Sequence, residues 1–191
     1  MTKIDIPLPD IVGTPYGGGF FAGTFLLNGQ LHALIVSPKA EGETRAPFKD
    51  HNSTTEGARS LRDGMANSQA MIDGHHPAAA FCHDLKIGGF DDWYLPSRHE
   101  MALLAENLMP GAGYVPEQTA AEAFKVGGAE AFERNWYLTS TEFSAGYVWV
   151  QTFSSGYQTN GDVKDWSGLV RAVRKVPFSP SPLSTAASRA A

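Results

Sequence analysis

An Asn-Gly pair near the start of the chain constrains its fold more than any other local feature. Asn28-Gly29 separates two apolar runs, at residues 20–27 and 30–36. Both central residues of a type I′ turn need positive φ angles, which asparagine and glycine adopt more readily than other residues. The sequence therefore predicts a β-hairpin over these residues.

The stretch after the hairpin lacks strand patterning. Residues 37–54 are polar and rich in turn-forming residues, so we predict a loop there. Between residues 55 and 72, Ala58, Leu61 and Met65 recur at helical spacing and favour a helix, which two internal glycines weaken.

Two further helices are predicted in the middle of the chain. A short one spans residues 77–85 and starts with a proline, which the first turn of a helix tolerates. Ser97 and Glu100 have the spacing of a capping box, in which each side chain accepts a backbone N–H of the other residue. The helix that they start is expected to end near Asn107. Residues 109–134 are predicted to be loop, with a short helix around residues 120–124 as an option.

Strand patterns dominate the C-terminal part of the chain. We predict strands at residues 136–141, 147–153 and 169–176. Helices in the middle with strands at both ends indicate an α+β fold, with an N-terminal hairpin, central helices and closing C-terminal strands. We expect an antiparallel sheet in which the two ends of the chain meet.

The length of 191 residues fits one domain with short extensions. Prolines among the first residues predict an extended arm over residues 1–16, and the domain itself is expected at residues 17–176. Residues 177–191 are rich in proline, serine and alanine and predict a flexible tail.

Charge and composition disfavour several classes of partner. The net charge is −5 and the sequence has no basic stripe, which argues against nucleic acid. No apolar stretch approaches the ~18 residues of a membrane span. The single cysteine, Cys82, cannot form an internal disulfide, and the N-terminus lacks the apolar core of a secretory signal. We therefore expect folding in a reducing cytoplasm.

A group of soft ligands invites a zinc hypothesis. His75, His76, Cys82 and His83 lie within nine residues of one another, but their spacing matches no standard zinc finger. On a helix, Cys82 and His83 diverge by about 100°. A thiol nucleophile at Cys82 would also need a positioned base, which a sequence neighbour seldom provides. We expect neither a metal nor catalysis at these residues.

Two groups of carboxylates are candidate sites. Asp91, Asp92 and Glu100 could form a carboxylate cluster, and Glu142, Asp162 and Asp165 could supply oxygen ligands for calcium. Turn and capping roles explain the first group better, because Asp91-Asp92 follows two glycines. Acids on turns are common in antiparallel domains, so calcium is the less favoured reading of the second group. We expect no cofactor.

The residues after the 147–153 strand have the composition of a protein-binding loop. Tyrosine and tryptophan offer rigid contact area, while small polar residues adapt their hydrogen bonds. We expect partner contacts from this set: Tyr157, Gln158, Asn160, Asp165 and Trp166. An ordinary hydrophilic turn, with Trp166 in the core, remains the alternative.

Four motifs carry a resemblance to a known family. Residues 88–104, GGFDDWYLPSRHEMALL, resemble the pattern G-x-x-D-W-R-L-P-T-x-x-E-L-x-x-L of the Lcl C-terminal domain family. Residues 136–142, 147–156 and 169–174 are similar to that family's Y-W-S-S-T-E, A-W-x-V-x-F-x-x-G and V-R-x-V-R segments. The order and spacing are kept over residues 83–176.

The resemblance marks a set of scaffold residues: Trp93, Leu95, Pro96, Glu100, Trp149, Arg171 and Arg174. Trp93 and Leu95 are expected to face a core beside the capped helix. One of the two arginines is expected to meet a carboxylate such as Glu100 or Glu142.

The opening of the chain is similar to a variant of this family in tailed bacteriophages, at residues 13–23 and 33–39. The resemblance implies a C-type-lectin-like fold, related to phage tropism determinants and to formylglycine-generating enzymes. It implies a virion protein of the tail or baseplate, or a capsid decoration protein. Its partners would be other virion proteins, copies of itself in a homo-oligomer, and a host receptor of protein or glycan.

The chain departs from the family and its relatives in three ways. Leu138 replaces the tryptophan of the Y-W-S-S segment. The formylglycine-generating enzymes use a pair of reactive cysteines, and this chain has one, which disfavours their oxidase chemistry. An enzyme of that type, or a metal-dependent enzyme, is the alternative function. The Glu-Pro-Asn and Trp-Asn-Asp signatures of calcium lectins are missing.

Overall fold

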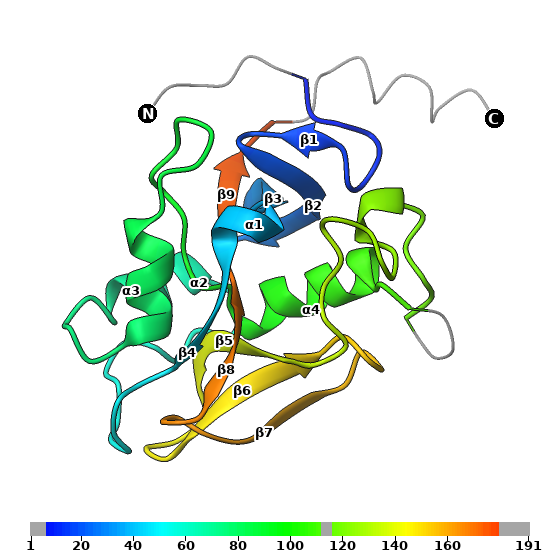
Figure 1. The fold of residues 1–191 in the computed structure, drawn as a ribbon. Helices are drawn as coiled ribbons and strands as arrows, with labels where there is room; N and C mark the ends of the chain where they lie inside the picture. The colour runs from blue at the N-terminus through cyan, green and yellow to red at the C-terminus, as the bar shows by residue number, and fades with distance from the viewer. Residues whose placement is uncertain (1–6, 112–115, 180–191) are drawn as a thin grey trace.

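The computed structural model describes residues 7–111 and 116–179, which form two β-sheets with helices between and beside them (Figure 1). The first sheet has the order β1-β2-β3-β9 and contains β1 (Pro15–Tyr16), β2 (Gly19–Leu27), β3 (Gln30–Val36) and β9 (Val173–Pro177). The second has the order β4-β8-β5-β6-β7 and contains β4 (Glu43–Pro47), β8 (Ser167–Arg171), β5 (Trp136–Glu142), β6 (Tyr147–Thr152) and β7 (Gln158–Val163).

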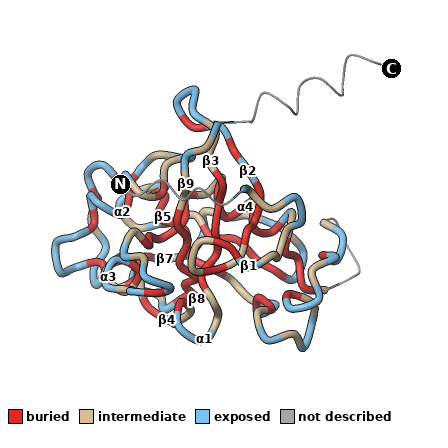
Figure 2. Tube along the Cα trace, turned by 90° about the horizontal axis from the view of Figure 1, so that it is seen from above, coloured by how far each residue is buried: buried red, intermediate tan, exposed pale blue. Residues whose placement is uncertain are grey.

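One helix packs against both sheets. The helices are α1 (Lys39–Gly42), α2 (Gly64–Gln69), α3 (Pro77–Asp84), α4 (Arg98–Leu108) and the short 3-10 helix η1 (Glu122–Phe124). Helix α4 packs against β2 of the first sheet and against β5 and β6 of the second (Figure 1). Buried residues gather along the central strands and this helix, while the loops at the periphery are exposed (Figure 2).

Several local predictions are confirmed. Asn28 and Gly29 have φ angles of 50° and 79° at the turn between β2 and β3. The Ser97 side chain accepts from the Glu100 amide, and the Glu100 side chain accepts from the Ser97 amide, at the start of α4. Strand β9 pairs with β3, so the N-terminal hairpin and the last strand share one sheet. The α+β class is therefore correct.

The predicted helix over residues 55–72 is wrong, because only α2 forms within it. The backbone amides of the segment before α2 donate to side chains further along the chain instead. The amide of Thr55 donates to Glu142 Oε2 at 2.6 Å, and the amide of Ser60 donates to Asn67 Oδ1 at 2.9 Å. Gly57 has a φ angle of +84°, which a right-handed helix excludes.

The segment at residues 37–54, predicted as loop, contains α1 and β4. The single strand predicted at residues 169–176 is two strands, β8 and β9, which belong to different sheets. The backbone of Ala172 bonds to neither sheet partner, because its carbonyl accepts from Ser37 and its amide donates to Gly42, both at 3.0 Å. The chain therefore crosses from the second sheet to the first at this residue.

The expected single antiparallel sheet is also corrected. The second sheet is mixed, because β5 and β8 pair in parallel through Tyr137 and Leu169. Its edge strand β7 was missed, since the sequence QTNGDV lacks apolar alternation. Polar edge strands of this kind limit pairing with other chains.

The ends of the described chain pack against the domain. Within the predicted arm, Pro15 and Tyr16 form β1 against β2, and Leu8 and Val12 contact the core. Residues 1–6 of the arm and residues 180–191 of the tail lie outside the described residues. None of the helices in the described ranges has the length and apolarity needed to span a membrane.

Both family arginines meet carboxylates, but not those expected. Arg171 is fully buried and contacts Glu43 at 3.1 Å and Glu130 at 2.9 Å, while its Nε donates to the carbonyl of Ser37 at 2.9 Å. Arg174 binds Asp92 through two bonds of 2.6 and 2.9 Å. The expected partners were wrong because Glu100 caps α4 and Glu142 binds the side chains of Lys164 and Arg59.

We predict that Arg171→Met lowers the free energy of unfolding by roughly 3–5 kcal/mol, because two largely buried carboxylates lose their cation. Arg45→Ala is the control, since Arg45 and Glu133 are 3.6 Å apart and both 48% exposed. That change should cost about 0–1 kcal/mol. Equal effects in chemical denaturation would contradict the role of Arg171.

Candidate functional site

Exposed apolar side chains gather at one end of the second sheet. Phe143 and Tyr147 flank the turn between β5 and β6 and are 49% and 44% exposed. Val163 on β7 is 41% exposed and lies opposite Tyr147 on β6. The rings of Phe143 and Trp149 meet edge to face at 5.7 Å. We call Phe143, Tyr147, Trp149 and Val163 the aromatic rim.

The alternation of β6 explains why these rings face outward. Val148 and Val150 point to the opposite side of the strand and are fully buried. Tyr147 and Trp149 therefore share the other face, where α4 covers only part of the sheet. Trp149 is half-buried and Tyr147, one step closer to the turn, is exposed.

The start of α4 holds Trp149 in place. The guanidinium carbon of Arg98 lies 3.9 Å from the centre of the Trp149 ring, a cation–π arrangement. Arg98 is fixed in turn by Gln158, which accepts from Arg98 Nε at 2.9 Å and donates to the Arg98 carbonyl at 2.8 Å. Thr139 donates to the Trp149 carbonyl at 2.8 Å. The ring is thus positioned before any partner arrives.

A buried ion pair lies directly behind the rim. Glu142 and Lys164, whose chain neighbours are the rim residues Phe143 and Val163, bind each other with both side chains fully buried. Glu142 also accepts from Arg59 Nη2 at 2.8 Å and from the amide of Thr55 at 2.6 Å. The pair therefore fixes the two strand ends that carry the rim.

Burial and hydrogen bonding act on these groups in opposite directions. Burial raises the pKa of Glu142, but bonds from Lys164, Thr55 and Arg59 outweigh it and hold that pKa below its usual value. Burial lowers the pKa of Lys164, which Glu142 restores only in part. The carboxylate is therefore ionised at neutral pH and depends on its donors.

The predicted contact residues are divided between two ends of the sheet. Tyr157 is 61% exposed and meets Trp136 edge to face at 6.4 Å, at the turn between β6 and β7. Asp165 is exposed in the turn after β7, beside the rim. Trp166 is half-buried and packs on the core.

Two of the expected loop residues lie on a strand instead. Gln158 and Asn160 belong to the edge strand β7, so their placement on a loop was wrong. Gln158 is engaged by Arg98. Phe143 and Tyr147 were not among the expected contact residues, and the role of Lys164 had no sequence signal, because it depends on the pairing of β6 with β7.

The four zinc candidates do not converge. Cys82 is in the core, where burial raises the pKa of its thiol. His76 is buried and bound to Thr55 at 2.9 Å and Asp73 at 2.7 Å, while His83 is exposed beside Asp84. A reactive thiol at Cys82 is equally unsupported by this environment.

Among the described residues, neither carboxylate group converges on one point. Asp92 binds Arg174, and Glu100 is buried among hydrogen-bond donors. In the second group, Glu142 is occupied by cationic side chains and Asp165 is exposed in a turn. Burial raises the pKa of Asp162.

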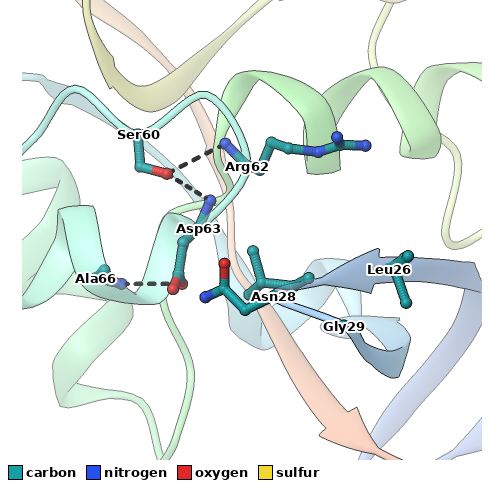
Figure 3. A pocket seen from close by; sticks show the side chains of 8 residues that line it. Leu26, Asn28, Gly29, Ser60, Arg62, Asp63 and Ala66 are labelled. Atoms are coloured by element: carbon teal, nitrogen blue, oxygen red, sulfur yellow. Dashed lines mark hydrogen bonds between the residues drawn. The ribbon is translucent and has the colours of Figure 1, made fainter.

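A shallow depression of about 470 Å³ lies between the β2–β3 turn and the start of α2 (Figure 3). Its polar groups serve the fold. Asp63 accepts from the amide of Ala66 at 3.2 Å and pairs with Lys175, and its own amide donates to Ser60 Oγ at 2.9 Å. The Arg62 side chain extends away from these groups (Figure 3). We therefore assign the depression a structural role, as the place where the β2–β3 turn meets the segment before α2.

The sequence matches the Lcl C-terminal domain family over residues 45–174. The chain belongs to this family. A fimbrial protein from Bacteroides ovatus ATCC 8483, a solved structure, has a similar fold with a TM-score of 0.52 and 15% sequence identity. The alignment covers 76% of this chain and 36% of that one, so this chain spans about a third of the fimbrial protein. Comparison with curated proteins gives no match.

The residues that carry the Lcl C-terminal domain motif are structural here. Trp93, Leu95 and Pro96 are buried. Glu100 accepts from the amides of Ser97 at 2.7 Å and Gly64 at 3.1 Å, and from the Tyr94 hydroxyl at 2.7 Å. The motif thus holds α2, α4 and the segment before α4 together.

We predict that Glu142→Gln lowers the free energy of unfolding at pH 7 by roughly 3–5 kcal/mol, because Lys164 loses its buried partner. The folded pKa of Glu142 is depressed, so its contribution is present above the unfolded pKa of about 4.3 and is lost as pH falls through the folded pKa. The difference between wild type and variant should narrow in acid, as followed by denaturation at several pH values. Glu122→Gln, at a side chain 83% exposed, is the control. A difference that stays constant down to acid pH would refute this role.

Proposed function

We propose that this chain is a non-enzymatic binding and assembly protein of a tailed-bacteriophage virion, with the aromatic rim as its contact surface. The observation that carries the proposal is the gathering of Phe143, Tyr147 and Val163, all exposed, at one end of a sheet. Contiguous apolar surface of this kind marks interaction sites.

The rim has the properties of an efficient anchor. Tyrosine and tryptophan bury large areas while only two torsions must be fixed, and they are enriched among residues that dominate binding. The stacking of Arg98 on Trp149 and the ion pair behind the rim reduce the ordering that a partner must impose. Asp165 adds a polar border beside the apolar centre, as in most protein interfaces.

The finer fold and the setting are part of the proposal. A C-type-lectin-like arrangement is supported by an α+β fold whose first hairpin and last strand share a sheet, with the rim on the late strands. The virion setting rests on the resemblance of residues 13–23 and 33–39 to phage variants of the family. A tail or baseplate position is favoured over capsid decoration, with assembly after synthesis in the host cytoplasm. Identical copies in a tail form closed rings, so a homo-oligomer is proposed as well.

The enzyme alternative receives less support. Its thiol chemistry would need an accessible cysteine, and the thiol of Cys82 is enclosed in the core with a raised pKa. The arginine and carboxylate groups of the family motif are likewise engaged in structural bonds.

We predict that Tyr147→Ala and Phe143→Ala abolish incorporation into purified phage particles without lowering the melting temperature. Both side chains are exposed, so their loss leaves no core cavity. Leu104→Ala is the matched contrast, because this fully buried side chain should cost roughly 2–5 kcal/mol of stability. Incorporation is measured by mass spectrometry of particles from cells that express each variant.

Particles that contain no wild-type chain would overturn the virion setting. Rim variants that are incorporated normally at unchanged stability would overturn the contact surface. If Tyr157→Ala alone prevents incorporation, the contact lies at the opposite end of the β6–β7 hairpin.

A further inference from the structure

Three ligand-type side chains meet where two loops come together beside α3. Asp50 lies in the loop after β4, and His75 lies just before α3. The Asp50 carboxylate contacts both neighbouring imidazoles, that of His51 through Oδ1 and that of His75 through Oδ2 at 2.8 Å. The two rings are 5.3 Å apart at 87°. One ligand atom from each residue lies within 4.8 Å of the others.

The backbone joins the two loops at the same place. The amide of Asp50 donates to the carbonyl of His75 at 3.0 Å. The amide of His75 donates to Asp73 Oδ1 at 2.9 Å, which fixes the turn before α3. The positions of Asp50 and His75 are therefore set by main-chain bonds as well as by their own contacts.

The chain neighbours of the cluster, Lys49 before Asp50 and His76 after His75, are buried. Phe48 is fully buried and meets the buried His76 ring edge to face at 5.7 Å. The amide of Lys49 donates to the carbonyl of Lys164 at 3.0 Å, and its ammonium donates to the carbonyl of Thr54 at 3.0 Å. An exposed cluster with buried residues directly before Asp50 and directly after His75 keeps its geometry without a ligand.

We propose that Asp50, His51 and His75 form a surface binding site for a divalent transition-metal ion, with Zn²⁺ as the representative. Two imidazoles and one carboxylate are a ligand set that zinc accepts, and three protein ligands leave a fourth position open to solvent. Imidazole also suits copper and nickel, whereas magnesium and calcium prefer oxygen ligands.

Acidic groups gather at this position. The Asp50 carboxylate is exposed and contacts both imidazoles. Asp73 contributes a second carboxylate nearby, through its bonds to His75 and His76. The Lys49 ammonium is directed to Thr54 and Thr55 rather than to the three ligands.

The site differs from the one that sequence spacing suggested. Of the four soft ligands between residues 75 and 83, only His75 takes part. Its partners come from 24 and 25 positions earlier in the chain and are brought there by the pairing of the two loops. The proposal is independent of the aromatic rim.

The experiment uses the full chain without a histidine tag, freed of metal by chelator, and titrated with ZnCl₂ by calorimetry. We expect one equivalent of zinc, weakened at least tenfold in His51→Ala and in His75→Ala. The matched control is His83→Ala, since His83 also contacts a neighbouring aspartate, Asp84, and is similarly exposed. Its zinc affinity should equal that of the wild type.

Two further measurements separate binding from folding. The metal-free variants should melt at the wild-type temperature, and zinc should raise the melting temperature of the wild type and His83→Ala only. Amide NMR signals of residues 49–54 and 73–77 should shift on titration. The proposal is overturned if the wild type binds no zinc, or if the His51→Ala/His75→Ala double variant binds it equally well.

Discussion

The structure depends on one buried cation, the guanidinium of Arg171. It lies at the end of β8, one residue before the chain leaves the second sheet, and its partners come from β4, from the loop after β3 and from the segment that precedes β5. A buried arginine with one missing carboxylate would be strongly unfavourable, so these segments are held in one arrangement. The crossing at Ala172 and the approach of the two sheets both follow from this geometry.

A second buried pair relates the core to the surface. Glu142 and Lys164 hold the loop at residues 53–59 against β5 and the turn after β7, since Lys164 also donates to the carbonyl of Ser53 at 2.7 Å. The aromatic rim lies on the outer side of this pair, and Lys49, next to the metal-ligand cluster, bonds to the Lys164 backbone. Two exposed features that are far apart in the sequence thus share one interior support.

Local signals in the sequence were enough for a large part of the fold. The Asn28-Gly29 hairpin, the capping box at Ser97 and the strand at residues 147–153, observed as β6, each depend on signals within a few residues, and each was predicted correctly. Strand β4 and the break at Ala172 could not be predicted, because long-range hydrogen bonds decide them. The sites divide in the same way. The exposed aromatic Tyr157 could be chosen as a candidate from local sequence, but the aromatic rim and the Asp50–His75 contact depend on pairing between distant segments.

The division of the last strand also determines the order in which the chain can fold on the ribosome. Strand β8 lies between β4 and β5, and β9 completes the pairing of β3, so each sheet waits for residues 167–177. While those residues are still in the exit tunnel, β4 has no neighbouring strand, and the edge of β3 that pairs with β9 is open. Native pairing of both sheets therefore follows the emergence of residues 167–177 from the tunnel, and contacts of such long sequence separation form slowly. Nascent chains of this protein consequently expose strand edges until residues 167–177 have emerged.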